Sequence, residues 1–102
     1  PEWLDLEVKG EGEHKLLAPK TLGGRINIYW VWIGNLGDSE VRVGFRWERE
    51  PAVWWNRVLP YLDGCVWHPP KPKSGGMNEA LFLRVVGDGA RLSVSILYGE
   101  ML

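Results

Sequence analysis

The chain has 102 residues, a formal net charge of −1, 45% hydrophobic residues and 25% charged residues. This length fits one folded domain, 1–102, and the composition is that of an ordinary globular protein rather than a disordered one. No apolar run is long enough for a transmembrane helix, and a single cysteine cannot form an internal disulfide. The near-neutral charge does not favour a nucleic-acid-binding protein. Seven tryptophans give the chain an unusually large aromatic content.

Alternation of apolar and polar residues with a period of two predicts strands along most of the chain. The predicted strands are, in chain order, Leu4–Lys9, Arg25–Ile33, Glu40–Glu48, Leu81–Val86 and Arg91–Gly99. The second of these is apolar at nearly every position, which predicts a central strand or a strand that is covered on its second face. Simple alternation puts Ile26, Ile28, Trp30 and Trp32 on one of its faces, and Tyr29, Val31 and Ile33 on the other.

Three connecting segments carry turn or loop signals. Gly87-Asp88-Gly89 predicts a hairpin between the last two strands, because tight hairpin turns need positive φ angles. Pro51–Gly64 opens with proline and ends with glycine, which predicts a single helical turn or an irregular crossover. Residues 68–79 contain several prolines followed by Ser74-Gly75-Gly76, and this composition predicts a long loop.

Strands at roughly ten-residue spacing predict an all-β fold, either a β-sandwich or a small OB-like barrel. The passage from Ile28 to Asp38, with Asn35-Leu36-Gly37 at its end, leads into an alternating strand that begins Val41-Arg42-Val43. It resembles the B-to-C passage of immunoglobulin-like domains of the CARDB type, which are found on prokaryotic surface and secreted proteins. The resemblance covers about a quarter of the chain. It implies an immunoglobulin-like sandwich of about seven strands, an adhesion or spacer role and no catalytic residue.

The tryptophans divide into two groups. Trp30, Trp32 and Trp47 have apolar neighbours on predicted strands, so we expect them to fill the core. The other group lies beside the irregular segments and gives the candidate partner-binding residues, which are Trp54, Trp55, Tyr61, Trp67, Lys71 and Lys73. Exposed aromatic residues can contact a protein partner, a sugar or a base. The alternative is that the tryptophans seal one end of the core.

Other chemistry has weaker signals. Arg42 and Arg46 share one face of a strand, and Arg91 could join them across a sheet to contact phosphates. Cys65 and His68 have the spacing of metal ligands, but the chain has too few cysteines and histidines for a structural zinc site. No catalytic motif is present. We therefore expect no enzyme activity, no metal and no cofactor.

These observations favour a non-enzymatic structural or interaction module, expected to be a small subunit of a larger assembly such as a virion or surface component. A protein partner or self-association is expected, and no membrane span. Carbohydrate binding through exposed tryptophans is the first alternative, and single-stranded nucleic-acid binding is the second. The absence of glutamine beside many charged residues is a thermophile tendency. No signal peptide is recognised, so a cytoplasmic or virion location is expected.

Overall fold

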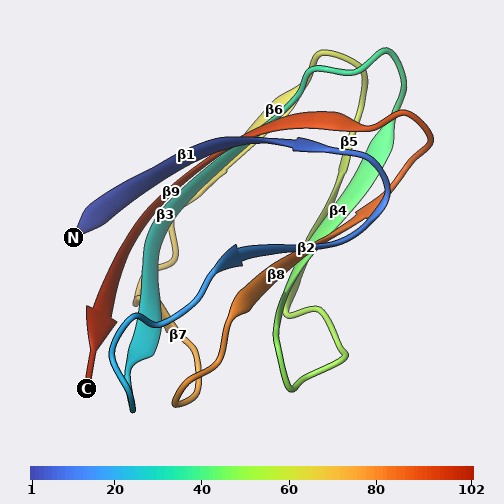
Figure 1. Cartoon of the computed structure of the whole chain (residues 1–102). Coiled ribbons are helices and arrows are strands. Elements are labelled where there is room, and N and C mark those ends of the chain that lie inside the picture. The colour runs from blue at the N-terminus through green and yellow to red at the C-terminus, as the bar shows by residue number, and fades with distance from the viewer.

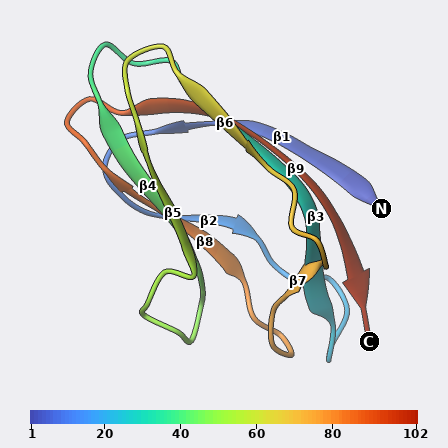
Figure 2. The ribbon, with the colours of Figure 1, turned by 180° about the vertical axis from the view of Figure 1, so that it is seen from behind.

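The structure is a computed structural model that describes all 102 residues. It contains nine β-strands and no helix. The strands are β1 (Glu2–Lys9), β2 (Gly12–Leu17), β3 (Arg25–Asn35), β4 (Val41–Trp47), β5 (Trp55–Leu59), β6 (Gly64–Trp67), β7 (Lys73–Ser74), β8 (Leu81–Val86) and β9 (Arg91–Met101). Figure 1, and the view from behind in Figure 2, show these strands in two layers.

Each layer is an antiparallel sheet. Sheet A has the strand order β1-β9-β3-β6, with β7 pairing along the same central strand β3, and sheet B has the order β2-β8-β4-β5. The predicted all-β sandwich is confirmed. Each sheet has open edges, so the alternative of a closed barrel is excluded.

The strand order is that of a jelly roll, in which the first strand lies beside the last and most consecutive strands lie in opposite sheets. In the immunoglobulin arrangement the first two strands share a sheet. Here β1 and β2 lie in opposite sheets, so the connectivity differs from the one that the sequence resemblance implied.

The turn at Gly87-Asp88-Gly89 also joins strands of opposite sheets. It joins β8 to β9 as expected, and Gly87 and Gly89 have positive φ angles of 154° and 66°. However, β8 belongs to sheet B and β9 to sheet A, so the prediction of a hairpin is wrong. The turn chemistry fixes a local change of direction, but pairing with distant strands decides which sheet each strand joins.

A register shift in β3 decides which of its side chains enter the core. Against β9, Ile28 pairs with Tyr98 and Trp30 pairs with Leu97, so Tyr29 is an extra residue in β3. A β-bulge of this kind exchanges the two faces for every later residue. The β3 side chains that are fully buried are Ile26, Ile28, Val31 and Ile33. Trp30 and Trp32 are only half-buried on the outer face, and their assignment to the core is wrong because simple alternation ignores the bulge.

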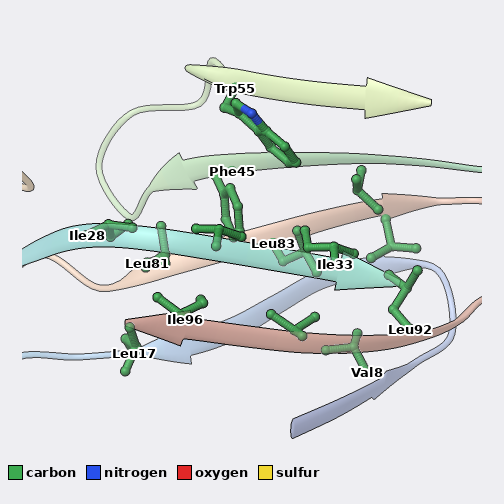
Figure 3. Close-up of a cluster of buried hydrophobic side chains, with 14 of the residues drawn as sticks. Val8, Leu17, Ile28, Ile33, Phe45, Trp55, Leu81, Leu83, Leu92 and Ile96 are labelled. Carbon is green, nitrogen blue, oxygen red and sulfur yellow. The ribbon is translucent and has the colours of Figure 1, made fainter. Parts of the chain in front are cut away.

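One hydrophobic core of twenty buried residues lies between the sheets. Figure 3 shows its side chains reaching in from both layers, including Phe45 and Leu83 from sheet B and Ile96 from sheet A. All three are fully buried. Trp47 is 3% exposed, so its predicted place in the core is confirmed.

The segment Pro51–Gly64 does not form the predicted helical turn. It contains β5, which pairs with β4 from Val41↔Leu59 to Phe45↔Trp55. Strand pairing prevails because β4 offers a free edge and because Trp55 and Leu59 become buried when they pair there. Pro60 directly follows β5, where its missing N–H removes no bond from the ladder.

Residues 68–79 form a long connection, as predicted, but one that is packed against sheet A. Only Lys73 and Ser74 form a strand, opposite Ile28 and Asn27 of β3. The N–H of Gly75 then donates to the carbonyl of Ile26 at 2.9 Å. The connection therefore extends the edge that β6 begins.

Candidate interaction surfaces

The three predicted contact tryptophans form one aromatic cluster. The ring centroid of Trp67 lies 5.6 Å from that of Trp54 and 6.2 Å from that of Trp55. Trp54 and Trp55 also pack on Phe45, at 5.5 and 5.1 Å. Trp55 belongs to the edge of sheet B and Trp67 to β6 in sheet A. The cluster therefore closes one side of the sandwich, which is the geometry of the hydrophobic seal.

Both adjacent tryptophans face the interior. Trp55 is 6% exposed and Trp54 is half-buried, and their indole N–H groups are inaccessible and have no hydrogen-bond partner. A fully extended segment would direct one of the two outward. Trp54 instead precedes β5 in an irregular stretch, where its backbone N–H donates to the carbonyl of Phe45 at 2.9 Å. Each unpaired buried donor costs about 1–3 kcal/mol, which the burial of aromatic area must offset.

The remaining predicted contact residues are divided among three places. The ammonium group of Lys73 lies 5.1 Å from the ring centroid of Trp54, so it makes a cation–π contact at the rim of the cluster. Tyr61 is 55% exposed in the turn between β5 and β6, beside the exposed Leu62. Lys71 is exposed in the connection between β6 and β7.

The outer face of sheet A carries an aromatic patch that the sequence analysis did not assign. We define the sheet A patch as Trp3, Trp30, Trp32, Val66 and Leu97. The pairings Trp3↔Leu97 and Leu97↔Trp30 put these residues in one row across the sheet, and Trp32 lies opposite Val66 in the next. The rings of Trp3 and Trp30 meet edge to face, with centroids 5.3 Å apart.

Two members of this patch are largely open to solvent, since Trp3 is 56% exposed and Val66 is 57% exposed. One signal in the sequence could have identified Trp3. The alternation of Leu4, Leu6 and Val8 with charged residues already places Trp3 on the polar face of its strand. No local signal could have placed Trp30 and Trp32 there, because the bulge at Tyr29 moves them to that face.

The outer face of sheet B carries arginines arranged around one carboxylate. Glu13 accepts hydrogen bonds from the Nε atoms of Arg84 at 2.7 Å and Arg46 at 3.2 Å. Partial burial alone would raise the pKa of Glu13, but these two hydrogen bonds outweigh it and lower the pKa below its ordinary value. Arg46 also lies over the ring of Phe82, 4.8 Å from its centroid.

Arg91 does not join this group. It lies on β9 in sheet A, where its Nε atom pairs with Glu7 at 2.7 Å, so the predicted alignment with Arg42 and Arg46 is wrong. Alternation alone cannot show which sheet a strand enters. Arg84 of β8 takes the expected place, because Arg84 lies opposite Gly44 and beside Arg46 of β4. A shallow groove of about 420 Å³ on this face has Arg42 and Arg84 beside Val53, Val58 and Val86.

The structure groups no three His, Cys, Asp or Glu side chains closely enough to hold a metal ion. His68 is exposed and Cys65 is half-buried on β6. Burial raises the pKa of the Cys65 thiol, and Asp63 adds to this effect although Arg57 opposes it. The structure contains no helix that is long and apolar enough to cross a membrane.

No protein-family model and no curated protein matches the chain. Two solved structures do match it over nearly its whole length. A chain in the acid-stable capsid structure of Helicobacter pylori bacteriophage KHP30 matches 99% of this chain with 92% of its own length, at a TM-score of 0.67 and 17% sequence identity. The crystal structure of PirA matches 95% of this chain with 93% of its own, at a TM-score of 0.55 and 15% identity. At these identities the likeness shows a shared fold.

Proposed function

We propose that this chain is a non-enzymatic structural subunit of a virus particle, where it contacts other protein subunits. The observation that carries the proposal is the capsid match, because nearly the whole of both chains superimposes as one jelly roll.

The surface supports a role in protein association. Interfaces between proteins use clusters of aromatic residues as buried anchors. The sheet A patch supplies such a cluster on a flat sheet face, with Trp3 as its most exposed aromatic residue. The three tryptophans proposed from the sequence pack against one another in the aromatic cluster. We therefore propose the sheet A patch as the contact surface in their place.

Particles purified on density gradients from the virus or host that encodes the chain provide the test. Quantitative mass spectrometry should find the chain in the particle fraction at a fixed ratio to the main shell protein. Trp3→Ala should reduce its incorporation, whereas Leu22→Ala should not, because Leu22 is 91% exposed in a turn and is not a member of the patch. Absence of the chain from intact particles would refute the structural role.

Carbohydrate binding is the second candidate function, and the exposed indole of Trp3 is the observation that favours it. A sugar ring could stack on the exposed face of this indole, whereas the rings of Trp54 and Trp67 are half-buried. Tryptophan fluorescence of the wild type and of Trp3→Ala, titrated with a panel of polysaccharides, tests this function. A shift in the wild type that Trp3→Ala abolishes would favour it over the virion role.

A further inference from the structure

The four edge strands of the sandwich differ in how well they are protected against pairing with another chain. Edges are normally protected by short strands, prolines or bulges. β2 has a register shift between Lys15 and Leu17, β5 ends at Leu59 directly before Pro60, and β6 has only four residues and is followed by His68 and Pro69. β1 is the longest and most regular of these edges, since its eight residues pair one to one with β9, and its protection is limited to Pro1 before it and to its charged side chains.

The free edge of β1 presents backbone groups at alternate residues. The N–H of Gly10 donates to the carbonyl of Ala90 at 2.8 Å, in line with the register of the β1–β9 pair. In an antiparallel ladder the bonded residues alternate, so the even-numbered residues of β1 bond to β9. The N–H and C=O groups of Trp3, Asp5, Glu7 and Lys9 therefore point away from the sheet. Figure 1 shows β1 with only β9 beside it.

We propose that β1 pairs antiparallel with β1 of a second copy, joining the two A sheets around a two-fold axis at Glu7. A two-fold axis makes one strand complementary to itself, because each copy supplies the same free groups in reverse order. This register places Asp5 of each copy opposite Lys9 of the other. On the inner face it places Leu6 opposite Val8, so the two cores meet at the joint.

The charges favour this register over its neighbours. An axis at Val8 would pair Glu7 with Lys9 twice, but it would also put Asp5 opposite Glu11 twice. An axis at Leu6 would put Asp5 opposite Glu7 twice, and an axis at Asp5 would put two aspartates face to face; like charges in such positions are unfavourable. With the axis at Glu7, both Asp5–Lys9 pairs are attractive. The one like pair, Glu7 with its copy, is neutralised because each Glu7 already has Arg91 at 2.7 Å.

Sedimentation equilibrium of the purified wild-type chain, over a range of concentrations, tests the proposal. A dimer is expected, and its hydrogen exchange should slow at the amides of Asp5, Glu7 and Lys9 as concentration rises. Asp5→Lys and Lys9→Glu should each weaken the dimer roughly tenfold or more, since each turns two attractive pairs into repulsive ones. Mixing the two variants should restore a heterodimer, because each introduced charge then faces an opposite one.

Lys15→Glu serves as the matched control, since it makes the same charge change at an exposed position on β2 in sheet B and should leave the dimer unchanged. Circular dichroism checks that each variant is folded. A wild-type chain that stays monomeric at about 1 mM, or a dimer that neither charge reversal weakens, would overturn the proposal. The virion role is measured separately on particles, so either idea can fail alone.

Discussion

The side-chain amide of Asn35 donates a hydrogen bond to the backbone carbonyl of Leu59 at 3.0 Å, joining the end of β3 in sheet A to the end of β5 in sheet B. The same amide donates to the carbonyl of Ser39 at 2.8 Å, and its oxygen accepts from the N–H of Gly37 at 3.0 Å. Asn35 is 1% exposed. One buried side chain therefore holds two turns together at this end of the sandwich.

Removal of this amide should destabilise the whole fold. We expect Asn35→Ala to lower the free energy of unfolding by about 2–3 kcal/mol, because it leaves buried backbone groups without partners. Asn35→Asp should cost at least as much at neutral pH, since a carboxylate would face carbonyl oxygens. Urea denaturation measures both. Asn56→Ala, at an exposed position, is the control and should change stability little; equal effects at both positions would contradict the role of Asn35.

The two groups of tryptophans should differ in their effect on stability. Trp55→Ala should lower the free energy of unfolding by about 3–5 kcal/mol, because it opens a cavity in the aromatic cluster. Trp3→Ala should cost less than about 1 kcal/mol, since more than half of that side chain already contacts water. Guanidinium denaturation followed by circular dichroism provides the comparison. A large loss from Trp3→Ala would show that the sheet A patch serves the fold rather than an interface.

Stability should fall in acid partly through Glu13. Its folded-state pKa lies below the ordinary value of 4.5, so its contribution is complete above pH 4.5 and is lost as the pH falls through the folded pKa. The contribution should be at most about 1 kcal/mol, because solvent screens a pair that is a third exposed. Thermal unfolding of the wild type and Glu13→Gln should therefore differ at pH 7 and converge well below pH 4.5. A constant difference at all pH values would exclude this linkage.

The thermophile origin inferred from composition stays a prediction, and it has a direct test. We expect the melting temperature to exceed about 65 °C, the upper end of the range for domains from mesophiles. Differential scanning calorimetry at pH 7 measures it. The ion pairs around Glu13 are one expected contributor, since paired charges are desolvated at lower cost at high temperature. A melting temperature well inside the mesophile range would remove the support for this origin.

Much of the secondary structure could be predicted from local sequence. Alternation identified β1, β4 and β9 nearly at their observed bounds, because each has one face on the core and one on solvent. A continuous apolar run identified β8. The same alternation placed Trp47 correctly in the core. Local patterns missed β2, β5, β6 and β7. The residues of β5, for example, become a strand only because β4 offers them an edge.

The positions of the candidate site residues also depend on contacts between the two sheets. Local sequence predicts Trp54, Trp55 and Trp67 as exposed contact residues, because the segments around them lack strand periodicity. Their rings meet only because the edges of the two sheets come together on that side of the sandwich. Tyr61 does lie exposed, as a contact residue requires, but Trp3 of the sheet A patch was unassigned and Trp30 was expected in the core.

The sequence by itself determined that this protein is built from strands with a heavily aromatic interior, since side-chain periodicity and turn residues are local properties. Only the tertiary structure decided the sheet to which each strand belongs, the bulge at Tyr29 that moves Trp30 and Trp32 outward, and the position of β1 at an edge of sheet A. Those features depend on hydrogen bonds and packing between segments far apart in the chain, where local patterns carry no information.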